Sequence, residues 1–497
     1  MYSKKSLTIN FIMNTFLTIS SFIFPLISFP YVSRILLPVG TGRVSFATSV
    51  ISYFSILAQL GIPTYGIRAC ARVRNNKSEL TVTVHELFLI NLITSIFSYI
   101  AFFIALCTVP KLMQDRILFL IISSTIFFNL IGMEWLYKAL ELYTYITIRS
   151  IIFKFIALVA MFFLIHEQRD YVCYGAITIF AASASNILNF FNIHKLIGRK
   201  SSQLYNLSRH IKPVFVFFAM SCATTVYTNL DTVMLGFMRS DTEVGLYNAA
   251  VKVKAILLGI VTSLGTVLLP RVSYYLENAM VKEFQKIAEK SLHFVLLLAG
   301  PLCIYFILFA KESILFLSGN EYFGAILPMQ IIMPTLVMIG LTNIMGIQML
   351  VPMGKETLVL CSEVAGAVVD LILNAIFIPI YGAVGAALGT LIAEVAVWFV
   401  QFYFLRMEIK GFYKRFHYGI LISAVSTGAI ASVWVKRMEW SPFVTLTISS
   451  IIYFSSYLLV LFLTKETLVV EILHNISNKI NKYHLKYQTV KKNNREL

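Results

Sequence analysis

The sequence predicts an all-α integral membrane protein with about fourteen transmembrane helices. Of the 497 residues, 58% are hydrophobic and only 13% are charged. A soluble domain carries roughly twice that share of charged residues. The mean hydropathy is +0.79, and apolar stretches long enough to cross a bilayer follow one another along the whole chain. The fold class is therefore a bundle of membrane helices.

Each predicted span is an apolar segment of about 20 residues between clusters of charge. The spans are residues 9–30, 43–62, 83–109, 117–133, 146–166, 171–191, 213–235, 245–269, 291–310, 325–350, 357–378, 382–405, 417–435 and 441–463. With both termini in the cytoplasm, most Lys and Arg residues fall in inward loops, as the positive-inside rule requires. We expect the N-terminal apolar segment to be a retained first helix, because it is too long for a signal peptide and lacks a cleavage site.

The net charge of +17 follows these alternate loops, so it does not indicate a nucleic-acid-binding protein. The six cysteines are scattered singly and are expected to be small buried residues. The eight histidines show no metal-ligand spacing, and no metal site is predicted.

An internal repeat divides the predicted bundle into two halves. The segment beginning at Gly42 resembles the one beginning at Gly245, and Tyr174-Gly175-Ala176 is echoed by Tyr381-Gly382-Ala383. An even number of spans lies between the copies, so both enter the membrane in the same direction, related by a pseudo-two-fold axis along the membrane normal. The predicted parts are an N-terminal lobe (1–200), a C-terminal lobe (201–412), two extra helices (413–463) and a basic cytoplasmic tail (464–497).

The segment around Gly382, Gly385 and Gly389 places small residues four positions apart. Such spacing lets two helices approach closely. We expect close helix packing there rather than a dinucleotide loop, because no strand precedes the segment.

Four cations lie inside predicted spans, where an ionised side chain costs at least about 2.5 kcal/mol. They are Arg149, Lys154, Lys252 and Lys254. On a helix Lys252 and Lys254 point about 200° apart, so only one of them is expected to face a cavity. Each of these charges needs a partner, water or a function.

Polar stripes occur on four predicted spans. They comprise Asn10, Asn14, Ser21 and Ser28; Thr224, Thr228 and Asp231; Glu363, Asp370 and Asn374; and Thr390, Glu394 and Gln401. The stripes predict either the walls of a hydrated cavity or a set of interhelical hydrogen bonds. Cations in such a cavity suit an anionic substrate, and carboxylates suit ion pairs or an ion-coupling site.

Several segments together resemble Wzx-type flippases of polysaccharide repeat units, in the superfamily that also holds multidrug MATE exporters and lipid II flippases. The resemblance covers most of the chain. Its carrying segments are Pro25 to Arg68, Glu134 to Lys154, Leu230 to Val253, Val267 to Arg271 and Leu371 to Glu394.

This resemblance implies a two-lobe transporter that moves an undecaprenyl-pyrophosphate-linked oligosaccharide to the outer leaflet of a bacterial plasma membrane, by alternating access. The predicted substrate-binding residues are Arg34, Asn14, Arg149, Lys154, Lys252 and Asn374. The predicted ion-coupling or ion-pair carboxylates are Asp231, Asp370 and Glu394. A proton or sodium gradient is the candidate driving force, with no cofactor, and polysaccharide polymerase or assembly proteins are candidate partners.

Two other functions stay open from the residues. A cation-coupled drug antiporter should present a net acidic cavity, against which the intramembrane cations argue. A membrane polymerase or ligase acting on the same lipid carrier ordinarily needs a sizeable outward loop, and none is predicted.

Overall fold

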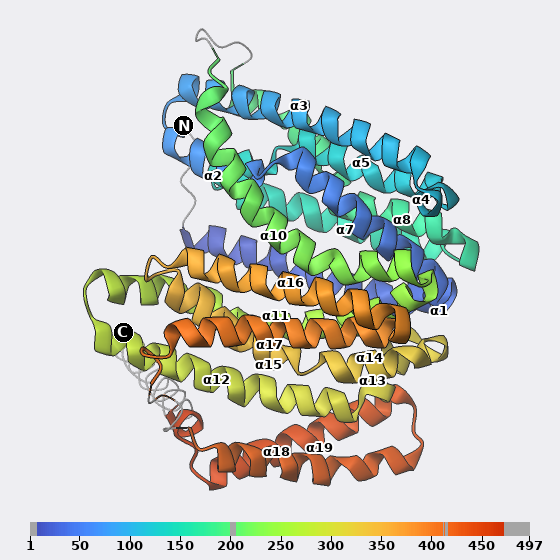
Figure 1. Ribbon diagram of the computed structural model, residues 1–497, viewed down its shortest axis with the longest axis vertical. Coiled ribbons are helices and arrows are strands. Elements are labelled where there is room, and N and C mark those ends of the chain that lie inside the picture. The colour runs from blue at the N-terminus through green and yellow to red at the C-terminus, as the bar shows by residue number, and fades with distance from the viewer. Residues whose placement is uncertain (1–6, 199–204, 411, 413–415, 472–497) are drawn as a thin grey trace, which may run out of the picture. The chain divides into compact units, whose positions relative to one another are not determined.

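The computed structural model describes residues 7–198, 205–410, 412 and 416–471, and this part of the chain is helical without any strand (Figure 1). Lys4 and Lys5, which are expected on the cytoplasmic side of the first helix, lie outside the described residues, as does the predicted basic tail from residue 472 onward.

The helices of the first half are α1 (Leu7–Gln59), α2 (Ile62–Val73), α3 (Lys77–Thr108), α4 (Pro110–Gln114), α5 (Arg116–Gly132), α6 (Glu134–Ala139), α7 (Tyr143–Leu164), α8 (Tyr171–Ile179), α9 (Asn186–Leu196) and α10 (Ser208–Met238). Those of the second half are α11 (Asp241–Glu277), α12 (Val281–Leu308), α13 (Ala310–Ser318), α14 (Ile326–Ile332), α15 (Thr335–Thr342), α16 (Glu356–Tyr381), α17 (Ala383–Leu405), α18 (Tyr418–Val433) and α19 (Pro442–Leu463). Two π-helical stretches, Phe180–Ala184 and Asn343–Leu350, continue α8 and α15.

In the described part of the chain, 11 helices are long and apolar enough to cross a membrane, or 12 if one bent pair forms a single span. The protein is thus a multi-pass membrane protein. The predicted count of about fourteen is not matched, for two reasons. Helix α1 covers the first two predicted spans, and α5, at 17 residues, is shorter than the other spanning helices.

Helix α1 is broken in the middle. Leu37 has a φ of 60° and a ψ of 177°, outside the helical region. The residue before a proline is disfavoured in the α region, and Pro38 lacks the N–H that would continue the hydrogen-bond ladder. The break separates a first arm (residues 7–36) from a second arm (residues 38–59), which correspond to the predicted spans 9–30 and 43–62.

The chain forms two compact units. Unit 1 comprises residues 1–256, 314–332 and 360–396, and unit 2 comprises residues 257–313, 333–359 and 397–497. In unit 1, buried Leu136 and Tyr137 belong to a large apolar core, and in unit 2 Leu292 and Met345 belong to another. Helices α18 and α19 lie side by side in unit 2 (Figure 1). The division into lobes at residues 200 and 412 stays a prediction.

Two glycines of the predicted repeat pack against each other's helices in unit 1. A Cβ built on Gly42 would lie 1.7 Å from the carbonyl oxygen of Asp241, and one built on Gly245 would lie 2.0 Å from that of Pro38. Each glycine thus touches the residue four positions before the other. A two-fold axis passing between the glycines would produce this reciprocal contact.

Ion pairs surround this contact. Asp241 pairs with Arg43 at 3.4 Å and with Lys111 at 2.6 Å. Arg43 also lies 3.4 Å from Asp115, which accepts a hydrogen bond from the Tyr171 hydroxyl at 2.7 Å. Four segments of unit 1 are therefore held together around the two glycines.

The predicted close packing around Gly382 is confirmed. A Cβ on Gly385 would lie 2.4 Å from the carbonyl oxygen of Phe377, and one on Gly389 would lie 2.4 Å from Asn374 Oδ1. Gly382 itself has a φ of 57°, which glycine adopts without strain, and it makes the turn between α16 and α17. The two helices can therefore approach backbone to backbone.

All six cysteines are free. The expectation that they are buried holds for Cys70 and Cys303, whereas Cys107 and Cys361 are exposed. An exposed thiol on a membrane helix can face lipid, so it needs no partner in the fold.

Candidate functional site

Three of the predicted substrate-binding cations lie along the first arm of α1. Lys154, on α7, donates hydrogen bonds to the hydroxyls of Ser20 (3.0 Å) and Ser21 (2.9 Å). The ammonium of Lys252, on α11, lies 3.5 Å from the centre of the Phe29 ring. A cation over an aromatic face is attracted by the ring quadrupole.

The third cation is Arg34, near the end of the same arm. Its guanidinium donates to the carbonyl oxygen of Phe316 at 2.6 Å, close to the end of α13, and to that of Pro30. From Ser21 to Phe29 the helix rises about 12 Å, so the cations occupy successive levels of one helix. We call Lys154, Lys252 and Arg34 the cation file.

Arg149 lies on α7 with Lys154 but makes different contacts. It is buried, donates to the carbonyl oxygen of Ser185 at 2.9 Å and lies 3.5 Å from the Glu134 carboxylate. Buried charges of this kind are normally paired. Its positive charge is therefore largely compensated by groups within unit 1.

The predicted residue Asn14 lies on the first arm of α1, towards its beginning, and its side chain is exposed. The neighbouring Met13 carbonyl oxygen accepts a hydrogen bond from Thr147 of α7 at 2.9 Å. Asn14 thus lies near the end of α7 that carries Arg149, on the same arm as the cation file.

The polar stripes of the predicted seventh, eleventh and twelfth spans meet at Asp231. Its carboxylate accepts hydrogen bonds from the Asn374 amide at 2.6 Å, from the Thr390 hydroxyl at 2.9 Å and from the Tyr247 hydroxyl. Asp231, Asn374 and Thr390 are all buried. Interhelical hydrogen bonding, one of the two predicted alternatives, accounts for these three residues.

Two further carboxylates lie in the same region. Asp370 is 1% exposed, and neither of its carboxylate oxygens accepts a hydrogen bond from the described residues. Glu394 is 6% exposed and lies near Tyr227 and Lys254. We call Asp231, Asp370 and Glu394 the carboxylate cluster. Among the described residues, no group of three or more His, Cys, Asp or Glu could hold a metal ion.

Lys252 and Lys254 face different surroundings, as their spacing predicts. Lys252 contacts Phe29, whereas the charged groups that act on Lys254 are Glu394, Asp231 and Asp370. Sequence reasoning left Lys254 out of the candidate site. Three carboxylates near one ammonium carry excess negative charge, which in a buried site favours uptake of a proton or a small cation.

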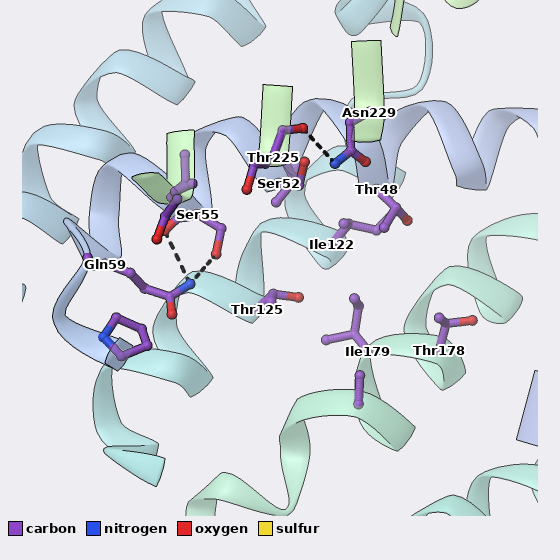
Figure 2. Close-up of a pocket in the computed structure, with 16 residues that line it drawn as sticks. Thr48, Ser52, Ser55, Gln59, Ile122, Thr125, Thr178, Ile179, Thr225 and Asn229 are labelled. Atoms are coloured by element: carbon purple, nitrogen blue, oxygen red, sulfur yellow. Dashed lines mark hydrogen bonds between the residues drawn. The ribbon is translucent and has the colours of Figure 1, made fainter. Parts of the chain in front are cut away.

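A separate cavity of about 470 Å³ lies in unit 1, lined by α1, α5, α8 and α10 (Figure 2). None of the predicted site residues lines it. The lining residues are Thr48, Ile51, Ser52, Ser55, Ile56, Gln59, Gly61, Pro63, Ile122, Thr125, Thr178, Ile179, Ala182, Ser221, Thr225 and Asn229.

The sequence does contain a signal for this cavity. Thr48, Ser52, Ser55 and Gln59 follow one another at the spacing of one helix face. Sequence reasoning missed this stripe because it carries no charge, and serine and threonine in membrane helices commonly bond to their own backbone. The stripe lies on the second arm of α1.

Membrane-spanning helices that bring a file of cations, a buried carboxylate cluster and a polar cavity into one unit define the class of the protein: it is a helical membrane transporter. The family model described as "Polysaccharide biosynthesis protein" matches residues 7–276, more than half of the chain. The chain belongs to this family. A second model, "MatE", matches residues 217–376.

Curated relatives and solved structures agree with this assignment. The chain is 24% identical over 406 residues to the "Putative O-antigen transporter" of Escherichia coli (strain K12), covering 81% of this chain and 98% of that one. The fold is similar to that of the "Lipid II flippase MurJ, inward closed conformation", with a TM-score of 0.63, 16% identity and coverage of 93% and 100% of the two chains. An inward-facing "multidrug resistance MATE family transporter of the MOP superfamily" gives a TM-score of 0.54 at 14% identity, covering 80% and 96%.

These comparisons confirm the predicted all-helical transporter fold and the resemblance to Wzx-type flippases. They leave the roles of individual residues as predictions.

Proposed function

We propose that this protein carries an undecaprenyl-pyrophosphate-linked oligosaccharide from the cytoplasmic to the outer leaflet of a bacterial plasma membrane, for assembly of a cell-surface polysaccharide. Both termini are cytoplasmic in this proposal. The flipped lipid then becomes available to a polymerase or other assembly proteins. The observation that carries the proposal is the cation file along the first arm of α1.

The physical obstacle to this transport is the charged diphosphate. An unpaired ion in hydrocarbon about 30 Å thick costs many kcal/mol. Lys154, Lys252 and Arg34 offer positive charge at successive levels of one helix, so a diphosphate moving along that helix keeps a counter-ion. The prenyl tail stays in the surrounding lipid, where its burial needs no protein group.

The cations are held by weak contacts that an anion can replace. Lys154 is bonded to two neutral hydroxyls, and Lys252 lies over the Phe29 ring with no carboxylate partner among the described residues. Arg149, in contrast, is paired with Glu134 and Ser185. In this proposal Lys154 and Lys252 therefore bind the diphosphate, Arg149 supports α7 electrostatically, and the exposed Asn14 contacts sugar.

Alternating access needs an energy source, for which we propose a proton or sodium gradient that acts through the carboxylate cluster. Asp370 supplies two oxygens without hydrogen-bond donors, and Asn374 Oδ1 is also buried without one. Neutralising the excess negative charge would change the repulsion among Asp231, Asp370 and Glu394. An ion that binds one conformation more tightly shifts the equilibrium toward it.

The proposal is tested by translocation in proteoliposomes. A fluorescent prenyl-diphosphate oligosaccharide is placed in one leaflet, and its appearance in the other is scored with an impermeant reagent. Lys154→Gln and Lys252→Gln should each abolish transfer while the protein stays folded in the membrane. Lys436→Gln is the matched control, because Lys436 lies over the Phe309 ring at 5.0 Å in unit 2.

Transfer at the wild-type rate in both cation variants would remove the cation file from the mechanism. Absence of transfer by the wild type, combined with export of cationic dyes, would favour the drug antiporter, whose acidic binding site the carboxylate cluster would then supply. Chain elongation of the lipid-linked glycan without its transfer would favour the polymerase.

A further inference from the structure

The cavity in unit 1 has a chemistry different from that of the cation file. Nine of its lining side chains are polar, and none of them is ionisable. They are the hydroxyl residues Thr48, Ser52, Ser55, Thr125, Thr178, Ser221 and Thr225 and the carboxamides Gln59 and Asn229. Figure 2 shows such side chains on opposite walls, from α1, α5, α8 and α10. The cavity's size lies within the range of roughly 300–1,000 Å³ that small-molecule sites occupy.

Several of these hydroxyls can act only as acceptors toward a ligand. Thr48 donates its proton to the Val44 carbonyl at 2.7 Å, Ser52 to that of Ser49 at 2.7 Å, and Thr178 to that of Tyr174 at 2.9 Å. A hydroxyl whose proton is engaged keeps its lone pairs. The cavity wall therefore presents fixed acceptors.

The carboxamides add further acceptors. Gln59 uses its NH₂ group on the carbonyl and hydroxyl oxygens of Ser55, at 3.3 and 2.9 Å. Asn229 uses its own on the carbonyl oxygen of Thr225 at 3.1 Å and the hydroxyl of Thr228 at 3.2 Å. Their side-chain oxygens remain available to a donor.

Uncommitted donors stand among these acceptors. The buried hydroxyl of Thr125 has no hydrogen-bond partner in the described part of the chain. Leaving a buried hydroxyl unpaired is unfavourable, so its position in the cavity points to a ligand that bonds to it. Ser221 and Thr225 also line the cavity, and their hydroxyls donate no hydrogen bond to the described residues.

The remaining wall is aliphatic. Ile51, Ile56, Ile122 and Ile179 contribute side chains without any aromatic ring. A neutral molecule with many hydroxyls and a C–H face matches this combination. A diphosphate would find no cation, a cationic drug would find no carboxylate or ring, and a lipid chain would leave the polar groups unpaired.

We propose that this cavity binds uncharged sugar residues of the transported glycan, apart from the cations that bind its diphosphate. The inference rests on the proposed function, and it assigns the sugar and the diphosphate to the two arms of α1. Thr125 and Thr225 are the residues expected to form hydrogen bonds with sugar hydroxyls. The cation file then binds the diphosphate, which all such lipids share, and the cavity binds the glycan, which differs among them.

The test compares two ligands on the purified full-length protein in nanodiscs. One is undecaprenyl diphosphate without sugar. The other is the lipid-linked oligosaccharide extracted from the parent strain after deletion of this gene, in which the untransported lipid accumulates. The dissociation constant for each ligand is measured for the wild type and for Thr125→Val and Thr225→Val, which keep the side-chain shape.

We expect each valine variant to weaken binding of the glycan-bearing lipid about threefold to tenfold, the effect of one lost hydrogen bond, and to leave binding of the sugar-free lipid unchanged. Thr125→Ser and Thr225→Ser keep the hydroxyl and should retain wild-type affinity. Thr447→Val is the control, because its hydroxyl is exposed on α19 and donates to its own helix.

Equal effects of the valine variants on both lipids, or no effect on either, would overturn the inference. So would equal affinity of the wild type for the two lipids. In any of these cases, loss of binding of both lipids in Lys252→Gln would still support the proposed function, so the two failures are distinguishable.

Discussion

Replacing Gly245 by alanine should separate the beginning of α11 from the break in α1. The added Cβ would lie 2.0 Å from the Pro38 carbonyl oxygen, whereas ordinary contact begins near 3.4 Å. That oxygen belongs to the backbone, so no side-chain rotation relieves the clash. The two segments must therefore move apart by more than about 1 Å, because packed interiors have little free space.

The magnitude follows from the known cost of overpacking. Inserting a methyl group into a filled site typically costs about 1–3 kcal/mol. If only the conformation with this contact is penalised, its population relative to the open one falls roughly fivefold to 150-fold. Alanine also favours a helix over glycine by about 1 kcal/mol, so α11 itself is not weakened.

Accessibility of a cysteine at position 41 reports this opening. Thr41 is 3% exposed, and its hydroxyl lies 2.7 Å from that of Tyr322. In a cysteine-free background carrying Thr41→Cys, we expect Gly245→Ala to raise the rate of labelling by a water-soluble maleimide about tenfold or more. Gly42→Ala should do the same, because the contact is reciprocal. Gly300→Ala is the control, since no atom lies within 4 Å of the position of its added Cβ.

Labelling of both glycine variants at the rate of the Gly300→Ala control would refute the reasoning, provided that size-exclusion profiles and thermal unfolding show folded protein. It would mean that the backbones slide past the new methyl groups without opening the buried position. Faster labelling in Gly245→Ala but not in Gly42→Ala would refute the reciprocity of the contact.

Three further predictions concern the charged and polar groups of unit 1. Asp231→Asn removes a charge from the carboxylate cluster, so lipid transfer should lose its dependence on an imposed proton or sodium gradient; persistence of that dependence would exclude Asp231 from coupling. Thr125→Val removes an unpaired buried hydroxyl, so the free energy of unfolding without ligand should rise by about 1 kcal/mol, which is measured as a higher melting temperature. A lower melting temperature would show that the Thr125 hydroxyl does have a hydrogen-bond partner in the protein. Glu86→Gln removes the buried carboxylate that lies 2.8 Å from His210 and also pairs with Arg209. Because Arg209 is partly exposed, the free energy of unfolding should fall by about 1–3 kcal/mol. An unchanged melting temperature would show that the pairing does not stabilise the fold.

Hydropathy and spacing predicted the parts of the structure that depend on one helix at a time. The alternation of apolar segments and basic loops identifies the membrane bundle, and the 200° between Lys252 and Lys254 anticipates their different surroundings. Glycine spacing likewise anticipated the packing of α16 on α17.

Contacts between distant helices could not be read from the sequence. That Lys154 bonds to Ser20 and that Asn374 bonds to Asp231 depends on how helices far apart in the chain are rotated against one another. The uncharged stripe of the second arm was missed for another reason. Its hydroxyls can satisfy themselves on their own helix, so only the cavity distinguishes them from ordinary membrane serines and threonines.

The break in α1 at Leu37 has a consequence for how such a transporter could diversify. The first arm of α1 carries the residues that contact Lys154 and Lys252, and the second arm carries the hydroxyl stripe. In the proposed function, mutations in residues 38–59 would therefore alter which glycan is accepted without changing the residues proposed to bind the diphosphate. Exchanging this segment between family members should therefore transfer the sugar preference and leave the rest of the transport cycle unchanged.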